Sequence, residues 1–247
     1  MWTSTALASE HRRYAGEVWR VVEAQHRIST NRLAANAEEQ SLLEDLVEEI
    51  KPRLPETARH LDYLLAAPFR YGHNQASRFR RADERPGNFY SSESEATAIA
   101  EAAYWKLRFF SRSPGFEPPS TTSEHTSFRA AVATERAIDL THAPFDQRAS
   151  DWIDPNDYSA CQELATTARE VKTEILRTQS ARDPLGGCNI VVLEPTAFTR
   201  RSPKLGQTWH FRFQEGKLLA LAALPSRERL EFTMGMFGLS AVKTLGC

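Results

Sequence analysis

The chain contains few of the features that mark the specialised classes of protein. It has three cysteines, Cys161, Cys188 and Cys247, and no C-x-x-C pair. An odd number without paired spacing predicts neither a disulfide framework nor a zinc site and favours a reducing compartment. No apolar run approaches the roughly 20 residues of a membrane-spanning helix, and the first residues, MWTSTALASEHRR, lack the apolar core of a signal peptide. We therefore expect a soluble cytoplasmic protein without a membrane partner.

The sequence also lacks an excess of charge of either sign, and it lacks the common catalytic motifs. The 31 lysines and arginines nearly balance the 32 aspartates and glutamates, which leaves a formal net charge of −1. Such a balance gives no global attraction to nucleic acid or to an anionic membrane. The sequence contains no G-x-x-x-x-G-K-[ST], G-x-G-x-x-G, H-E-x-x-H or G-x-S-x-G. No local motif therefore supports a phosphate-loop, dinucleotide-fold, zinc-protease or α/β-hydrolase function, and we expect no metal site.

The length and composition are those of one large globular domain with an extension. Two patterns near the start predict helices, over residues 9–28 and over residues 36–51, and the second ends before Pro52. The first pattern consists of apolar residues three and four positions apart, namely Tyr14, Val18, Val21 and Val22. We predict a helical N-terminal extension over residues 1–60 and a main domain over residues 61–247.

The second half of the sequence is mainly β. Residues 128–140 alternate between apolar and polar side chains, as a half-buried strand does. Short apolar segments at residues 174–178 and 189–193 flank turn-forming residues, and two alternating segments around Glu215-Gly216 predict a hairpin. Together with the helical patterns, these segments predict an α+β fold with a mixed or antiparallel sheet flanked by helices.

The stretch FYSSESEATAIAE predicts the end of a strand followed by a helix. Ser92 and Glu95 have the spacing of a capping box, so we expect the helix to begin near Glu93. Apolar residues three or four positions apart form its core stripe: Ala96, Ile99, Ala100, Ala103, Leu107 and Phe110. Glu101 lies off this stripe among small and aromatic neighbours. A carboxylate in that setting indicates either a functional group or the partner of an arginine.

Arginines, tyrosines, a glutamate and a serine recur in an order that resembles a known family. They are Arg70 and Tyr71 in PFRYG, Arg78 in SRF, Tyr90 in NFYSS, Glu101 eleven positions later, and Ser180 and Arg182 in TQSARDP. This order resembles the RES-domain family, which is named for an arginine, a glutamate and a serine. The resemblance spans roughly residues 65–225 and makes residues 61–247 a RES-like catalytic domain. The family's arginine corresponds to Arg70 or to Arg78.

The resemblance implies a fold similar to ADP-ribosyltransferases and an enzyme that degrades NAD as the toxin of a bacterial toxin–antitoxin pair. It implies two overlapping sets of site residues: catalytic Arg78, Glu101, Ser180 and Tyr90, and NAD-binding Arg70, Tyr71, Arg78 and Ser180. NAD is then the substrate and no cofactor is required. The expected partners are inorganic phosphate as one acceptor and a cognate antitoxin that binds DNA. A homodimer is an open alternative.

This chemistry matches what the side chains do. Cleavage of the nicotinamide–ribose bond builds oxocarbenium-like charge on the sugar, which the Glu101 carboxylate would stabilise in the transition state. The planar forks of Arg70 and Arg78 suit the pyrophosphate. The rings of Tyr71 and Tyr90 suit the cationic nicotinamide. Water, phosphate or a protein are equally compatible as the acceptor of the ribose.

Three other interpretations remain open at this stage. The arginine cluster of residues 70–85, interleaved with aromatic residues, is compatible with nucleic-acid binding, although Asp83 and Glu84 lie within it. The N-terminal helices are compatible with a non-catalytic interaction module or with self-association. Finally, Glu101 is compatible with a purely structural ion pair to Arg78.

Overall fold

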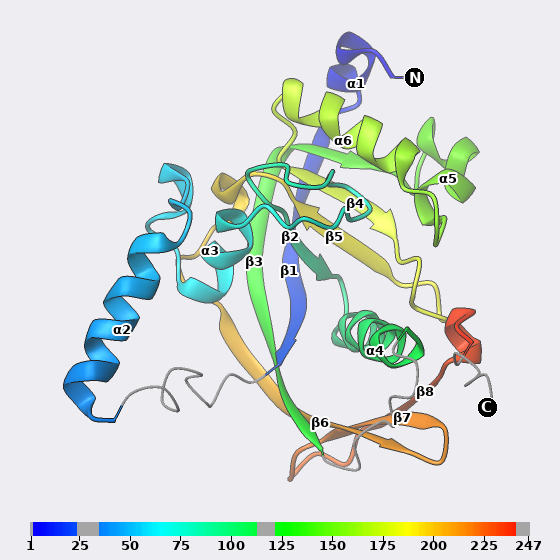
Figure 1. Cartoon of the computed structure of the whole chain (residues 1–247). Coiled ribbons are helices and arrows are strands. Elements are labelled where there is room, and N and C mark those ends of the chain that lie inside the picture. Colours follow the sequence, from blue (N-terminus) through cyan, green and yellow to red (C-terminus); the bar gives the residue numbers. More distant parts are fainter. Residues whose placement is uncertain (1, 24–34, 113–121, 241–247) are drawn as a thin grey trace, which may run out of the picture.

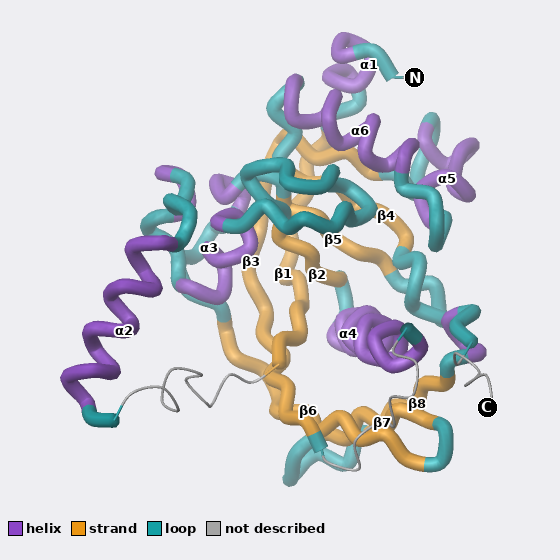
Figure 2. The backbone as a smooth tube through the Cα atoms, viewed as in Figure 1, coloured by secondary structure: helices purple, strands orange, loops and turns teal. Residues whose placement is uncertain are grey.

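The computed structural model describes residues 2–23, 35–112 and 122–240 of the chain, and Figures 1 and 2 show its backbone. The helices are α1 (Ser4–Ser9), α2 (Ala37–Ile50), α3 (Tyr63–Arg70), α4 (Glu95–Ser111), α5 (Ala149–Ile153) and α6 (Ser159–Glu170). The strands are β1 (Arg12–Glu23), β2 (Phe89–Ser92), β3 (Ser123–Asp139), β4 (Ile175–Gln179), β5 (Cys188–Val192), β6 (Lys204–Gln214), β7 (Lys217–Ala222) and β8 (Arg229–Thr233). The predicted α+β class, with a mostly antiparallel sheet flanked by helices, is confirmed.

The long strand β3 organises the sheet. It pairs antiparallel with β1 along most of its length, antiparallel with β6 near its start, and parallel with β4 at its end. On the far side of β1, Trp19 pairs with Ser92 of β2, and β2 continues through β5 to β4. These pairings close β3, β1, β2, β5 and β4 into a ring, whereas β6, β7 and β8 extend from it (Figure 1).

Helix α4 lies between the ring and the β6–β8 extension (Figure 1) and contacts β1, β2, β7 and β8. The predicted core stripe is confirmed for five of its residues: Ile99, Ala100, Ala103, Leu107 and Phe110 are buried against Trp209, Phe211 and Leu218. Ala96 is exposed. The predicted capping box is wrong: the helix is capped by Ser94, whose Oγ accepts a hydrogen bond from Thr97 N at 3.1 Å. Ser92 belongs to β2 and points to the site described below.

The predicted helix over residues 9–28 is wrong, because residues 12–23 form strand β1; residues 24–28 lie outside the described part of the chain. Both faces of β1 are covered. Tyr14, Val18 and Val22 pack in one core cluster, and Val21 packs in another. A strand with apolar residues on both faces lacks a clean alternation, and here its spacing imitates a helical stripe.

The other helices and strands that the sequence predicted agree with the structure. Helix α2 confirms the prediction for residues 36–51, and it projects away from the sheet in Figure 1. Strands β3, β4 and β5 and the β6–β7 hairpin are confirmed, and the hairpin turns at Glu215 and Gly216, both with positive φ. Within the described residues, no helix combines the length and the apolar character needed to cross a membrane.

Candidate active site

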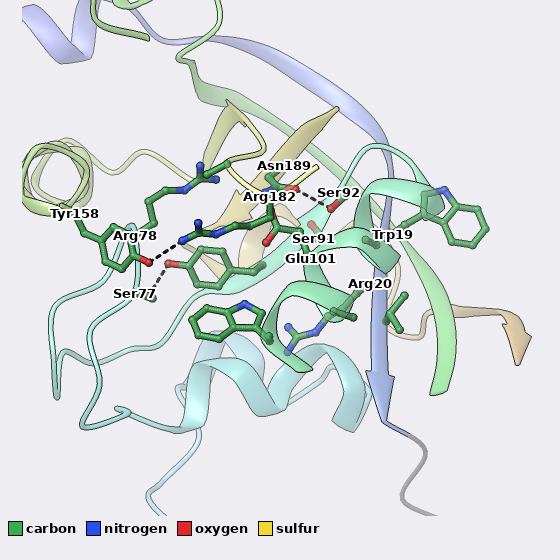
Figure 3. A pocket seen from close by; sticks show the side chains of 16 residues that line it. Trp19, Arg20, Ser77, Arg78, Ser91, Ser92, Glu101, Tyr158, Arg182 and Asn189 are labelled. Atoms are coloured by element: carbon green, nitrogen blue, oxygen red, sulfur yellow. Dashed lines mark hydrogen bonds between the residues drawn. The ribbon is translucent and has the colours of Figure 1, made fainter. Parts of the chain in front are cut away.

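A pocket of about 260 Å³ opens between α4 and the ring of strands (Figure 3). Elements far apart in the sequence contribute to its wall: β1, the loop before β2, β2 itself, α4, the start of α6, the loop after β4, and β5. The polar lining residues are Arg20, Ser77, Arg78, Tyr90, Ser91, Ser92, Glu101, Tyr158, Arg182 and Asn189, and the indoles of Trp19 and Trp105 add apolar surface. Of the six predicted site residues, Arg78, Tyr90 and Glu101 line this pocket.

The carboxylate of Glu101 is fixed by two donors at one oxygen. Its Oε1 atom accepts hydrogen bonds from Ser180 Oγ at 2.6 Å and from Asn189 Nδ2 at 2.5 Å. Asn189 is itself oriented, because Ser92 Oγ donates to its Oδ1 atom at 2.8 Å (Figure 3). Within the described residues Oε2 of Glu101 has no hydrogen bond. One oxygen thus holds the side chain in place, while the other is available to a ligand in the pocket.

Ser180 lies behind Glu101 and does not line the pocket. It is buried, and its Oγ atom accepts from the main-chain N–H groups of Arg182 at 3.1 Å and Asp183 at 2.9 Å while it donates to Glu101. One donated and two accepted hydrogen bonds use the full capacity of a hydroxyl. In this arrangement Ser180 orients the glutamate and has no hydrogen bond left for a ligand.

Arg78 and Tyr90 lie on the pocket wall and are held by the main chain of neighbouring loops. Arg78 Nη1 donates to the carbonyls of Trp152 at 3.2 Å and Gln179 at 3.1 Å. The phenol oxygen of Tyr90 accepts from Phe79 N at 3.1 Å and lies 2.8 Å from the hydroxyl of Ser77 (Figure 3). Arg78 forms no ion pair with Glu101 within the described residues, which contradicts the structural alternative for Glu101.

Arg182 is a lining residue next to the predicted Ser180. Its Nη2 atom donates to Pro155 O at 3.0 Å and to the hydroxyl of Tyr158 at 3.1 Å (Figure 3). Its guanidinium carbon lies 3.9 Å from the ring centroid of Tyr104, a cation–π contact that fixes the plane of the group. The sequence TQSARDP contained this arginine, but nothing in its local pattern predicted that it would face the pocket.

Arg20 and Asn189 are two further site residues that the sequence did not predict. Arg20 lies in the middle of β1, in a segment that was predicted to be helical, and Asn189 lies within the predicted strand of residues 189–193. The Nη1 atom of Arg20 is buried and has no hydrogen-bond partner among the described residues, although the residue as a whole is half-buried. Burial lowers the pKa of Arg20 to about 10.

Arg70 and Tyr71 are not among the residues that line the pocket. Arg70 is the last residue of α3, and Tyr71 follows it in an extended conformation. Their predicted contacts with NAD remain a prediction. Arg80, also in the arginine-rich loop, is buried and donates to the carbonyls of His73 and Gln75, so it organises this loop from within.

The pocket carries more positive than negative charge. Three guanidinium groups, those of Arg20, Arg78 and Arg182, line it together with one carboxylate, that of Glu101. In the described part of the chain, none of the three arginines forms a salt bridge. Unneutralised guanidinium groups around a concave site attract an anionic ligand. Among the described residues, no cluster of three or more His, Cys, Asp or Glu side chains forms a metal site.

Comparisons with known proteins identify the family of the chain. The model of the RES domain matches residues 53–214, about two thirds of the chain. None of the curated proteins compared with the chain matches it. Among solved structures, a chain of the crystal structure of the M. tuberculosis MbcT–MbcA toxin–antitoxin complex is similar, with 13% sequence identity and a TM-score of 0.46. That match covers 95% of this chain and 94% of the other.

Proposed function

The chain belongs to the RES domain family, and from this premise we propose that it cleaves the bond between nicotinamide and ribose in NAD. We further propose that it is the toxin of a bacterial toxin–antitoxin pair. The observation that carries the enzymatic part is Glu101, whose Oε1 is fixed by Ser180 and Asn189 while Oε2 is left for a ligand. No other carboxylate lines the pocket in the described part of the chain.

The position of Glu101 suits the charge that develops during this reaction. As the nicotinamide leaves, the ribose gains oxocarbenium character, and a preorganised carboxylate stabilises it more in the transition state than in the substrate. Hydrogen bonds from the ribose hydroxyls to Oε2 would strengthen as the ring flattens. Because Oε1 is already held, the carboxylate does not need to reorient during the reaction.

The rest of the pocket suits the remainder of the dinucleotide. Tyr90, Trp105 and Tyr158 give the lining aromatic surface that can stack on a cationic nicotinamide ring. The guanidinium groups of Arg78 and Arg182 supply positive charge for the phosphates. The pocket volume of about 260 Å³ lies below the roughly 300–1,000 Å³ of pockets that enclose whole ligands. We therefore expect the nicotinamide riboside end to be enclosed and the adenosine end to lie at the mouth.

The decisive experiment identifies the products formed from NAD. The purified full-length protein is incubated with NAD in the presence and absence of inorganic phosphate, and the products are separated by chromatography. Nicotinamide with ADP-ribose indicates hydrolysis, nicotinamide with a phosphorylated ADP-ribose indicates phosphorolysis, and nicotinamide with modified protein indicates ADP-ribosylation. NAD that remains intact at high protein concentration, with no inhibitor bound, would refute the proposal.

The toxin assignment requires that the activity harm the cell that makes it. An enzyme that consumes NAD without restraint stops growth, so a neutralising antitoxin, expected to bind DNA, should accompany it. Induced expression of the native chain should lower cellular NAD and arrest growth, whereas Glu101→Gln should do neither. Harmless expression of a chain that is active after purification, with no inhibitory protein bound to it, would argue against a toxin.

The arginine cluster gives little support to the nucleic-acid alternative. Arg80 is buried, and Arg78 is bound to main-chain carbonyls at the pocket wall. These two arginines are therefore engaged within the protein, which reduces the positive charge that the cluster offers to a phosphate backbone. Salt-dependent DNA binding by the full-length protein without NAD turnover would reverse this preference.

A further inference from the structure

Arg20 differs from the other two arginines of the pocket. Arg78 and Arg182 both donate to main-chain carbonyls, and Arg182 also binds a tyrosine hydroxyl. Arg20 has no hydrogen bond or ion pair among the described residues, and its Nη1 atom is sealed from solvent. Its guanidinium carbon lies 4.8 Å from the ring centroid of Phe89, which is a cation–π contact. The guanidinium therefore lies in the pocket with its hydrogen-bonding capacity unused (Figure 3).

An arrangement of this kind is unfavourable in the ligand-free protein. The buried Nη1 atom of Arg20 has lost its hydration and gains no hydrogen bond from the described residues in return. A neighbouring arginine shows the usual solution: Arg129 on β3 reaches Glu17 on β1 at 2.7 Å. Glu101 does not serve Arg20 in this way, since its hydrogen bonds go to Ser180 and Asn189.

The position of Arg20 in the chain adds a second observation. It lies on β1, which precedes the segment matched by the RES domain model, residues 53–214. Yet β1 forms one wall of the pocket, through Trp19, Arg20 and Val21. A segment outside the matched region therefore completes the site and supplies its unpaired cation.

We propose that Arg20 is an anion subsite of the pocket and that its partner is a phosphoryl group of the ligand. The identity of this phosphoryl group rests on the proposed function. The group is either the pyrophosphate of the dinucleotide or an inorganic phosphate that accepts the ribose. Both sources present oxygens that the planar guanidinium fork can bind bidentately. The N–H groups that are unsatisfied in the ligand-free protein would then be satisfied in the complex.

Binding to the full-length chain, measured by calorimetry in phosphate-free buffer, tests the subsite without requiring turnover. The probes are ADP-ribose, inorganic phosphate, and adenosine as a ligand without phosphate. Arg20→Met approximates the aliphatic stem of the side chain and removes the guanidinium fork. We expect it to weaken ADP-ribose binding by about 10- to 100-fold and to leave adenosine binding unchanged. Arg13→Met on the same strand, whose guanidinium forms an exposed ion pair with Glu135, is the control and should bind all three probes as the native chain does.

The binding measurements distinguish the pyrophosphate from inorganic phosphate as the partner of Arg20. Loss of ADP-ribose affinity assigns Arg20 to the pyrophosphate, whereas loss of phosphate affinity alone assigns it to the acceptor, and either result supports the subsite. If Arg20→Met binds both probes as tightly as the native chain, or if the native chain binds neither, the inference is wrong. The proposed function can fail independently of this inference: the native chain would then bind anions through Arg20 but release no nicotinamide from NAD.

Thermal unfolding without ligand separates this role from a structural one. Because Arg20→Met removes a half-buried guanidinium that has no hydrogen bond among the described residues and keeps the packing of the stem, we expect an equal or higher melting temperature than that of the native chain. Saturating ADP-ribose or phosphate should then raise the melting temperature of the native chain more than that of the variant. A lower melting temperature for Arg20→Met, with ligand shifts equal to those of the native chain, would identify a structural arginine and overturn the inference.

Discussion

Ser180 and Glu101, which are 79 positions apart in the sequence, are joined by a hydrogen bond of 2.6 Å from the serine hydroxyl to Oε1 of the carboxylate. The bond ties the loop after β4 to the middle of α4. Asn189 on β5 donates to the same oxygen, so the glutamate is held at once from the loop after β4 and from β5. The geometry separates two roles within the site: Glu101 faces the pocket, and Ser180 holds it there.

The first prediction concerns Glu101→Gln. The amide oxygen can still accept the hydrogen bonds of Ser180 and Asn189, so the fold should be retained and the free energy of unfolding should change by less than about 1 kcal/mol. The charge that opposes the oxocarbenium is lost, so NAD turnover should fall by about 100-fold or more. Chromatographic measurement of nicotinamide release and thermal unfolding on the same preparation check both parts.

The control for this variant is Glu95→Gln on the first turn of the same helix. Glu95 Oε1 accepts a hydrogen bond from Trp209 Nε1 at 2.8 Å, outside the pocket, and an amide oxygen can accept it too. Turnover should therefore stay near the native value. If Glu101→Gln lowered the melting temperature strongly while the folded fraction kept its activity, Glu101 would be a structural residue.

The second prediction concerns Ser180→Ala. The main-chain N–H groups of Arg182 and Asp183 lose their acceptor in a buried site, which should cost about 1–3 kcal/mol of stability. Glu101 keeps the hydrogen bond from Asn189 but is less well oriented. We therefore expect kcat for NAD cleavage to fall by about tenfold with little change in KM.

The matched control for Ser180→Ala is Ser111→Ala, at the last residue of α4. Ser111 is also buried, but its hydroxyl donates to Arg108 O within its own helix. This variant should leave kcat and KM at their native values. A rise in KM without a fall in kcat for Ser180→Ala would mean that Ser180 contacts the ligand directly and would contradict the orienting role.

The sequence predicted those parts of the fold that depend on local periodicity. The stripe of α4 and the β6–β7 hairpin were recognisable because each buries one face and repeats at the period of its own secondary structure. Strand β1 was not, because Val18 is buried on one face and Val21 is partly buried on the other, and together they imitate a helical spacing. Its β-branched and aromatic composition was the signal that favoured a strand.

The residues of the candidate site likewise fall into those that stand in a sequence motif and those that only the fold brings into the site. Glu101, Tyr90 and Arg78 stand in short motifs whose order carries a family resemblance, so the sequence predicted them. Arg20 and Asn189 enter the site only because the ring of strands brings β1 and β5 beside α4. That closure depends on pairings between distant segments, and a single arginine or asparagine within a strand has no local signal of such a role.

The third prediction concerns Tyr90→Phe. The variant keeps the ring in the pocket but removes the acceptor of Phe79 N and the partner of the Ser77 hydroxyl. The free energy of unfolding should fall by about 1–2 kcal/mol. The loop that carries Arg78 should become less ordered, so KM for NAD should rise more than kcat falls. Tyr63→Phe, exposed on α3, is the control and should match the native chain in steady-state kinetics and chemical denaturation.

The last prediction is the pH dependence of a charge network behind the site. Arg177 on β4 donates to both oxygens of Glu93, at 2.8 and 2.9 Å, and also reaches Asp139 at 3.3 Å. The hydrogen bond from Arg177 is the main reason that the pKa of Glu93 lies below its usual value in the folded protein. A carboxyl whose folded pKa is lowered contributes stability above its unfolded pKa and loses it as the pH falls through the folded value.

The stabilisation should therefore be complete at neutral pH and should decline below about pH 4. Glu93→Gln should lower the free energy of unfolding at pH 7 by about 1–2 kcal/mol, a value reduced by the partial exposure of the pair. The difference in free energy of unfolding between the native chain and Glu93→Gln should become smaller as the pH falls. Glu135→Gln, which removes only an exposed ion pair to Arg13, should follow the native curve. Urea denaturation between pH 3 and pH 7 measures the free energy of unfolding of all three chains. If the difference between the native chain and Glu93→Gln stayed constant over this range, the charge of Glu93 would not be the stabilising feature.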